Sequence, residues 1–422
     1  MDNNNSSANV QSRVPPRVPL PQPPPTRPPG GRPISGMPKT PTSKPAELGQ
    51  GSHSTLVKQM VKHAYAHKAS DIHIRVGEIP RFRIRGQMHP AEGQVKVTLD
   101  MFELYLREIL TPRQREEFAK NKELDTAIFY PGLVRCRVNC FETLTGGAIV
   151  LRLISLHVPS IEELGLPPVL KKIISLSQGL VLVTGPTGSG KSTTLAAMIR
   201  HLNENAYKHI ISIEDPIEYV HASERCLVSQ REVGLHTHDF HSSLRSALRE
   251  DPDVVLIGEM RDRTTINTAL QAAQTGHLVL GTLHTRNAIN AVNRLLNLFP
   301  PEDHQSMRIQ IVESLAAVVA QLLVPTTEGG RTAIHDVLIN TPAIQDYLFK
   351  GEDDEAFYLM RTDTHEGMQV MNNDLYQKVM TGRIALEEAE KVSPDPSELD
   401  RLMRTGGFDA SKSVRDFSKS SR

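Results

Sequence analysis

The chain has 422 residues, which is enough for two or three domains with sizeable cores. Its 48 basic side chains balance its 48 acidic ones, so the formal net charge of zero argues against a nucleic-acid partner. Three cysteines cannot form a disulfide framework, and no apolar run reaches the roughly 20 residues that span a bilayer. We therefore expect a cytoplasmic protein with reduced thiols.

Proline is concentrated at the N-terminus, where 13 of the 29 prolines fall within the first 50 residues. This stretch has almost no large apolar side chains, so it cannot bury a core. Residues 1–52 are therefore predicted to be a disordered, Pro-rich tail with polyproline II character.

Residues 53–156 combine helical and strand patterns. Apolar residues from Leu56 to Tyr65 have the spacing of an amphipathic helix, and residues 70–76 and 81–86 alternate like half-buried strands. A helical stretch over 99–119 precedes strands at 133–141 and 148–154. This order predicts a small α+β domain. Residues 157–168 contain three prolines and are interpreted as a linker.

Residues 169–404 alternate strands and helices. A continuous apolar run at 179–185 is typical of a parallel strand covered on both faces, and residues 191–205 are predicted to form a helix. Short apolar runs precede polar clusters at 209–215, 253–259 and 276–284. This pattern predicts an α/β domain with a doubly wound sheet and its chemistry at the carboxyl ends of the strands. Further helices are expected at 288–298 and 301–323, and a flexible tail at 405–422.

The strongest motif is GPTGSGKS at residues 185–192, between the first predicted strand and helix of that domain. Its glycines let backbone N–H groups curl around phosphate oxygens, which also face the positive end of the following helix. Lys191 is placed to reach the β- and γ-phosphates, and the Ser192 hydroxyl to bind Mg²⁺. ATP and Mg²⁺ are therefore the expected cofactors, bound by Gly185, Pro186, Thr187, Gly188, Ser189, Gly190, Lys191, Ser192 and Thr193.

Hydrolysis also needs a group that orients water, and two strand ends offer carboxylates. Glu259 follows the apolar run at 253–257, and Glu214 with Asp215 follows the run at 209–213. Either carboxylate could position the attacking water or hold the metal's water shell. The sequence leaves open which of the two does which.

Two histidines and two arginines complete the candidate catalytic residues. His284 follows a predicted strand at its carboxyl end and suits a role in sensing the γ-phosphate, whereas His277 precedes that strand and equally suits packing or an interface. Arg135 and Arg137 alternate on one predicted strand and so share a face. In an oligomer they could act on a neighbouring subunit's γ-phosphate; a solvated strand face is the alternative.

Taken together, four blocks resemble the secretion ATPases, and specifically the PilT family of type IV pilus retraction motors. In chain order they are GPTGSGKST (185–193), IEDPIEY (213–219), LIGEMRD (256–262) and GHLVLGTLHT (276–285). The resemblance implies a PAS-like N-terminal domain, a RecA-like ATPase domain and a homohexameric ring. It makes Glu259 the Walker B glutamate, Glu214 the Asp-box acid, His277 and His284 the His-box pair, and Arg135 and Arg137 the family's arginines.

The same resemblance implies partners and a location. The ring would lie in the cytoplasm at the inner-membrane base of the pilus machine. It would touch the membrane only through partners: a platform protein in the inner membrane and a paralogous pilus ATPase. ATP-driven domain closure would draw pilin subunits out of the fibre and so power twitching motility.

Two further comparisons with the pilus motors point in opposite directions. Extension motors carry four zinc-binding cysteines, which a chain with three cysteines lacks, so retraction is favoured. Retraction motors typically read AIRNLIRE near the C-terminus, and this chain reads AIQDYLFK at 343–350, with Gln345, Phe349 and Lys350 replacing two arginines and a glutamate. The alternatives are a PilU-like accessory motor, an ATPase of type II or type IV secretion or DNA uptake, and a nucleotide-gated scaffold with little turnover.

Overall fold

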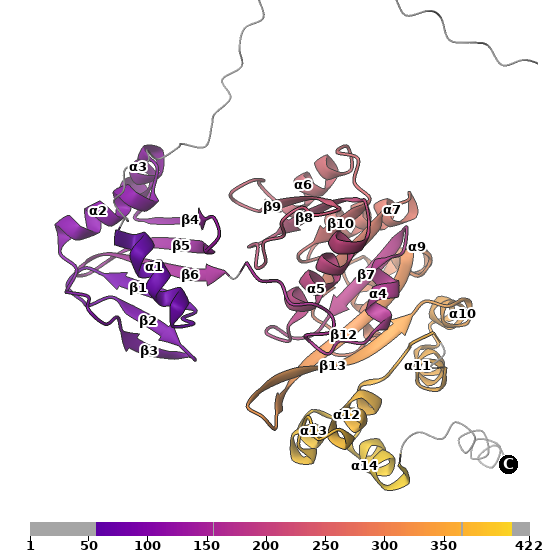
Figure 1. Cartoon of the computed structure of the whole chain (residues 1–422). Helices are drawn as coiled ribbons and strands as arrows, with labels where there is room; N and C mark the ends of the chain where they lie inside the picture. The colour runs from indigo at the N-terminus through magenta and orange to yellow at the C-terminus, as the bar shows by residue number, and fades with distance from the viewer. Residues whose placement is uncertain (1–55, 155, 364–365, 407–422) are drawn as a thin grey trace, which may run out of the picture. The chain divides into compact units, whose positions relative to one another are not determined.

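The computed structural model describes residues 56–154, 156–363 and 366–406 (Figure 1). The predicted N-terminal tail lies outside the described residues, as do residues 407–422 of the predicted C-terminal tail. Two sheets organise the described chain, one built before residue 155 and one after residue 178. None of the helices within the described ranges is long and apolar enough to cross a membrane.

Residues 56–154 form a six-stranded antiparallel sheet with three helices, in the strand order β3-β2-β1-β6-β5-β4. Helix α1 buries Val57, Met60, Val61 and Ala64, the stripe expected of an amphipathic helix. This composition agrees with the α+β prediction, and the PAS-like character stays an expectation. The elements are α1 Leu56–Ala66, β1 Asp71–Arg75, β2 Arg81–Ile84, β3 Gln87–Pro90, α2 Leu99–Ile109, α3 Pro112–Asn121, β4 Glu123–Tyr130, β5 Val134–Thr143 and β6 Gly146–Ile154.

The helical stretch expected at 99–119 is two helices that meet at Leu110 and Thr111. The Thr111 side chain accepts a hydrogen bond from the Gln114 N–H, and the Gln114 side chain accepts one from the Thr111 N–H. Pro112, which has no N–H to donate, occupies the first turn of α3. This capping box starts a new helix and thereby ends the previous one.

The second sheet has seven strands in the order β13-β12-β7-β11-β10-β8-β9. Its strands are parallel except for β13, which pairs antiparallel with β12. The strands are β7 Gly179–Thr184, β8 His209–Glu214, β9 Leu227–Glu232, β10 Val254–Ile257, β11 Leu278–Leu283, β12 Leu315–Thr326 and β13 Gly330–Ile339. The α/β fold predicted from the sequence is confirmed.

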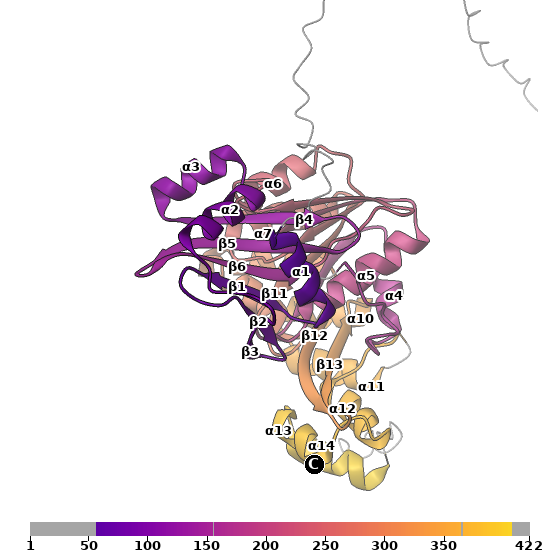
Figure 2. The ribbon, with the colours of Figure 1, turned by 60° about the vertical axis from the view of Figure 1, so that its left-hand side comes forward.

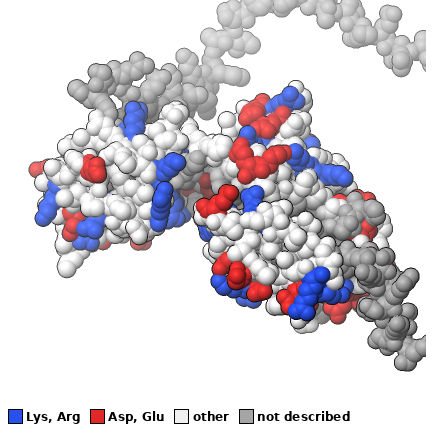
Figure 3. Space-filling model, turned by 60° about the horizontal axis from the view of Figure 1, so that its bottom comes forward, with Lys and Arg blue, Asp and Glu red and all other residues white. Residues whose placement is uncertain are grey.

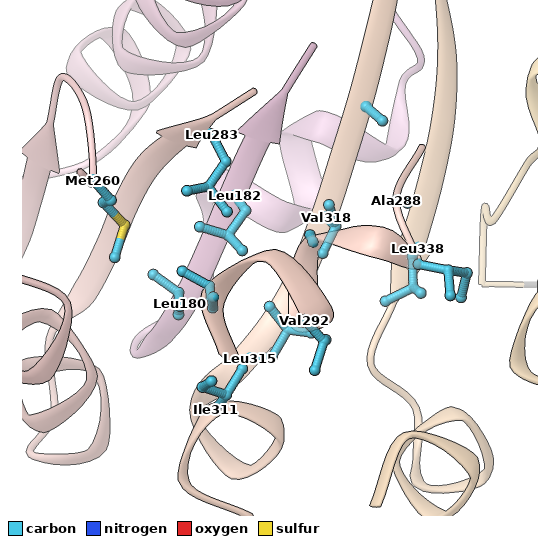
Figure 4. Packing of buried hydrophobic residues seen from close by; sticks show 14 of the residues in the cluster. Leu180, Leu182, Met260, Leu283, Ala288, Val292, Ile311, Leu315, Val318 and Leu338 are labelled. Carbon is cyan, nitrogen blue, oxygen red and sulfur yellow. The ribbon is translucent and has the colours of Figure 1, made fainter. Parts of the chain in front are cut away.

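Helices cover both faces of this sheet, which explains why its central strands are apolar throughout. Helices α4 and α5 pack on the face that includes Val181 and Val183, and Leu180 and Leu182 point to the opposite cluster, which α6–α9 help to form. Figure 4 shows Leu180 and Leu182 beside Val292 of α8 within that cluster. The helices are α4 Val169–Ile174, α5 Lys191–Asn205, α6 Phe240–Ala247, α7 Arg263–Gln274, α8 Asn290–Leu296, the 3₁₀ turn η1 Pro301–Asp303, and α9 His304–Ser314.

The prediction of one helix over residues 301–323 is wrong for the second half of that range. Helix α9 ends at Ser314, and the chain continues as β12 beside β7, with Val318 opposite Leu182. Apart from Gln321, the run from Leu315 to Val324 is apolar on both faces, and such a run has no periodicity that separates a buried helix from a buried strand. Pairing with a strand from a distant part of the sequence decides its conformation.

Five helices follow β13. They are α10 Pro342–Lys350, α11 Asp353–Thr362, α12 Met371–Met380, α13 Leu386–Val392 and α14 Pro396–Thr405. Helices α12–α14 gather against the β12–β13 hairpin (Figures 1 and 2). On the face drawn in Figure 3, acidic and basic side chains are interspersed with uncharged surface.

Candidate phosphate-binding site

The phosphate-binding loop connects β7 to α5 and depends on glycine at three positions. Gly185, Gly188 and Gly190 have φ angles of 145°, 81° and 89°, which residues with a Cβ rarely adopt. A Cβ on Gly185 would also lie 2.3 Å from the Gln321 carbonyl oxygen and 2.6 Å from Ser189 Oγ. Because α5 begins at Lys191, the unpaired N–H groups of its first turn face this loop. The result is a cradle for anionic oxygens.

The Lys191 ammonium lies inside the loop that precedes it. Its Nζ donates to the carbonyl oxygens of Gly185 at 2.9 Å and of Pro186 at 3.2 Å. Partial burial lowers the pKa of Lys191, and the carboxylates of Glu259 and Glu218 partly offset this effect. A phosphate group would offer this half-buried cation stronger acceptors than two neutral carbonyls.

Glu259 and His284 lie together at the carboxyl edge of the sheet, just beyond β10 and β11. Nε2 of His284 is 3.2 Å from Oε1 of Glu259, and Arg261 Nη2 donates to the other carboxylate oxygen at 2.5 Å. The hydrogen bond from Arg261 and the nearby positive charge lower the pKa of Glu259. Glu259 is therefore ionised at neutral pH, as an acceptor for a water proton must be.

Glu214 ends β8 on the same edge but in a more enclosed setting. Its Oε1 accepts hydrogen bonds from Ser212 Oγ at 2.7 Å and from Gln230 Nε2 at 3.2 Å. Burial raises the pKa of Glu214, which is the opposite direction from Glu259. The two carboxylates therefore differ: Glu259 is the more readily ionised, and Glu214 holds a proton more tightly.

A small cavity of about 40 Å³ joins Glu214 to the phosphate-binding loop. Ser192 and Tyr219 also line it, and the Tyr219 hydroxyl lies 3.0 Å from Thr193 Oγ1. In the described part of the chain, no group of three or more His, Cys, Asp or Glu side chains could hold a metal ion. Ser192 supplies a hydroxyl oxygen to this cavity and stays the predicted Mg²⁺ ligand, since Mg²⁺ commonly binds with nucleotides through few protein oxygens and the phosphates.

Three predicted residues lie elsewhere. His277 precedes β11 at the opposite end of that strand from His284, and its Nδ1 lies 3.1 Å from the Ala272 carbonyl oxygen near the end of α7. Arg135 is buried on β5, where its Nη2 donates to Glu232 Oε2 at 2.8 Å. Arg137 is half-buried on the same strand. His277 therefore lies at the opposite end of β11 from Glu259 and His284, whereas Arg135 contacts Glu232 at the carboxyl end of β9, in register with Glu214.

Comparison with known proteins gives a consistent result. The family model described as "Type II/IV secretion system protein" matches residues 46–391. The chain belongs to this family. It is 43% identical to the type IV pilus retraction ATPase PilT of Pseudomonas aeruginosa, over 78% of this chain and 95% of that protein. It is 41% identical to the type IV pilus ATPase PilU of the same organism, over 80% and 88%. A crystal structure of the retraction motor PilT with bound ADP aligns with a TM-score of 0.76 and 40% identity, covering 81% of this chain and 98% of that one.

Four residues that contact the phosphate-binding loop or the two carboxylates were not predicted as site residues: Tyr219, Gln230, Arg261 and Gln321. Tyr219 and Arg261 lie within the Asp-box and Walker B blocks, so their position in those blocks was an available signal. Gln321 Nε2 donates to the Ser189 carbonyl oxygen at 2.7 Å. Its only signal in the sequence is a single polar residue inside the apolar run from Leu315 to Val324.

Proposed function

We propose that this protein is an ATP-hydrolysing, homohexameric motor that powers type IV pilus retraction. The observation that carries the proposal is the meeting of a phosphate-binding loop with the Glu259–His284 pair at one edge of a parallel sheet. The likeness to PilT over nearly its whole length supports pilus retraction as the work that hydrolysis drives.

In this proposal the residues divide the work of one turnover. The loop N–H groups and Lys191 bind the phosphates, and Ser192 with phosphate oxygens holds Mg²⁺, which neutralises charge on those oxygens. Glu259 accepts a hydrogen bond from the attacking water, and His284 keeps the carboxylate oriented through its 3.2 Å contact. Glu214 shares a cavity with Ser192 and serves the water shell of the metal. Hydrolysis would require no covalent intermediate on the protein.

Arg135, Arg137 and His277 keep their proposed roles at the interface between subunits of the ring. The pairing of Arg135 with Glu232 means that a trans-acting role for Arg135 would require this ion pair to open. Among the residues that the structure describes, Arg137 forms no such ion pair, so it is the simpler candidate for that role. The platform protein of the inner membrane and a paralogous pilus ATPase are the proposed partners, at the cytoplasmic base of the pilus machine.

The direct test is deletion of the gene, scored for surface pili and surface motility. Many pili with no movement would support retraction, and cells without pili would point to assembly. Complementation with Glu259→Gln should leave the deletion phenotype in place, because a ring without turnover cannot retract. Restoration of movement by that variant would contradict the motor and favour a nucleotide-gated scaffold.

An accessory, PilU-like motor is the second candidate, and helix α10 carries the reason. In place of the arginines and glutamate typical of retraction motors, Lys350 donates to Asp346 at 2.6 Å on the exposed side, and Phe349 packs against the core. A deletion that lowers the force or frequency of retraction without abolishing it would favour this candidate. ATPases of secretion or DNA uptake are separated by the same deletion, which would then impair export or uptake and leave pili unaffected.

A further inference from the structure

Gln321 is a polar side chain in a setting that otherwise excludes polar groups. It is fully buried on β12, and its neighbours from Leu315 to Val324 are Leu, Ala and Val. Burial of an amide is unfavourable unless its polar atoms find partners. Gln321 Nε2 does find one: it donates to the carbonyl oxygen of Ser189, in the phosphate-binding loop, at 2.7 Å. The sequence positions joined by this bond are 132 residues apart.

This hydrogen bond fixes which way the amide points. The Ser189 oxygen can only accept, so the NH₂ group of Gln321 must face it and Oε1 must face away. Within the described residues Oε1 has no hydrogen-bond partner. Gln321 also lines a cavity of about 300 Å³ together with Gly190 and Thr193. The Nε2 group of Gln321 is therefore hydrogen-bonded to the loop, whereas its Oε1 atom forms no hydrogen bond within the described residues.

Two glycines allow β12 to come this close to the loop. A Cβ on Gly185 would lie 2.3 Å from the Gln321 carbonyl oxygen, and one on Gly190 would lie 3.2 Å from Gln321 Nε2. Strand β12 neighbours β7 on the side opposite to β11. Glu259 and His284 therefore approach the loop from the β10–β11 side, and Gln321 approaches it from the other.

The peptide unit between Ser189 and Gly190 links this contact to phosphate binding. In a trans peptide the C=O of one residue and the N–H of the next point in opposite directions. Because Gln321 holds the Ser189 carbonyl toward β12, the Gly190 N–H is turned away from β12, toward the interior of the loop. We infer that Gln321 is a positioning residue that pre-orients the phosphate-binding loop for nucleotide. The inference rests on the proposed function only for the identity of the ligand.

The test replaces Gln321 with Met, which keeps length and volume but removes the donor. Loss of one neutral hydrogen bond should weaken ADP binding by about three- to tenfold. The KM for ATP should rise in parallel, and kcat at saturating ATP should change by less than about twofold, because Gln321 does not approach the reacting atoms. The increase in melting temperature on adding ADP should shrink correspondingly.

Thr332→Val is the matched control. Thr332 is also buried, on the neighbouring strand β13, and its Oγ1 has no hydrogen-bond partner within the described residues. The control should leave ADP affinity unchanged whatever it does to the melting temperature. Equal ADP affinity in Gln321→Met and the unmodified protein would overturn the inference, as would an equal loss in Thr332→Val.

A second variant distinguishes positioning from packing. Gln321→Glu keeps the shape but aims an ionised carboxylate at the Ser189 oxygen, so it should bind ADP more weakly than Gln321→Met at pH 8. When the introduced carboxyl is protonated it can donate again, so its ADP affinity relative to Gln321→Met should recover as pH is lowered. ADP affinity of Gln321→Glu no greater than that of Gln321→Met at pH 5, where the introduced carboxyl is protonated and can donate, would contradict positioning. These ADP measurements do not depend on ATP hydrolysis. If the unmodified protein binds ADP but does not hydrolyse ATP, that result would contradict the proposed motor function and leave the inference about Gln321 standing.

Discussion

Nε2 of His284 lies 3.2 Å from Oε1 of Glu259, so the ends of two neighbouring strands, β11 and β10, are joined by their side chains beside the phosphate-binding loop. One carboxylate oxygen thus faces a histidine, and the other faces Arg261. Such a carboxylate is held in place from both sides and is kept ionised, which suits a group that must orient water repeatedly.

Glu259→Gln should lower ATP turnover on the order of a hundredfold and leave ADP affinity nearly unchanged. The amide keeps the size of the side chain but cannot accept a water proton. Steady-state phosphate release and ADP titration measure the two quantities. Glu313→Gln, an exposed substitution on α9, is the control and should behave like the unmodified protein. Turnover that matches the control would refute the role of Glu259.

Lys191→Ala should weaken ADP binding by on the order of a hundredfold, because it removes the half-buried cation that is proposed to bind the phosphates. Lys208→Ala is a matched control, since Lys208 Nζ also donates to a backbone carbonyl, that of Leu176, away from the loop. Calorimetric titration with ADP checks the pair. Normal ADP binding by Lys191→Ala would mean that the loop does not bind nucleotide.

The two histidines of the fourth block should respond differently. His284→Ala should reduce kcat by about tenfold or more, because Glu259 loses one of its two orienting partners. His277→Ala removes a contact with the end of α7 and should lower the melting temperature more than it lowers kcat. Turnover and thermal unfolding of both variants decide this. Loss of kcat in His277→Ala with an unchanged melting temperature would instead support an interface role in catalysis.

Asp336 should make stability depend on pH in an unusual direction. Burial raises the pKa of this carboxyl from 3.8 to about 7, although the N–H of Met371 donates to it at 2.6 Å. The folded state therefore holds a proton between pH 4 and 7 that the unfolded chain has released, so this contribution to stability is lost as pH rises through about 7. The nearby Asp374 carboxylate acts in the same direction.

The measurement is the melting temperature from pH 5 to pH 8 for the unmodified protein and for Asp336→Asn. The variant should gain stability relative to the unmodified protein as pH rises, because its amide needs no proton. Asp354→Asn, at an exposed position on α11, should show no such trend. A difference between Asp336→Asn and the unmodified protein that is constant with pH would contradict the raised pKa of Asp336.

Removal of residues 1–51 should leave ATP turnover and ADP affinity unchanged. The family model covers residues 46–391, and the loop, Glu259 and His284 are held by elements after residue 178. Parallel assays of the full and shortened chains check this. A shortened chain that binds ADP but fails to turn over would show that the Pro-rich segment takes part in the catalytic cycle.

The parts of the fold that follow from local sequence signals were predictable. Helix α5 spans Lys191–Asn205 in the structure, the bounds that the sequence predicts, because glycine precedes it and apolar residues repeat with helical spacing. The strands that carry the loop, Glu214, Glu259 and His284 were also predicted, because each is a short apolar run followed by polar residues. Their convergence at one edge follows from the general rule for parallel sheets.

What depends on strand order could not be predicted. Nothing in the sequence near Leu315 indicates that this segment pairs with β7, so the apolar run was interpreted as helix. The same missing information hid Gln321, whose partner Ser189 is close only after β12 takes its place in the sheet. The edge strand β3 was missed for another reason: it is exposed along its whole length and has no alternation of apolar and polar residues.

The position of β12 also has a consequence for synthesis. The loop that would bind nucleotide is translated 132 residues before the side chain that holds its Ser189 carbonyl. A ribosome-bound chain that ends before residue 315 has β7 and α5 but lacks the neighbouring strand on one side of β7. The loop is therefore incompletely supported until β12 has been translated, about three-quarters of the way along the chain, and we expect nucleotide to stabilise this domain most strongly after that point.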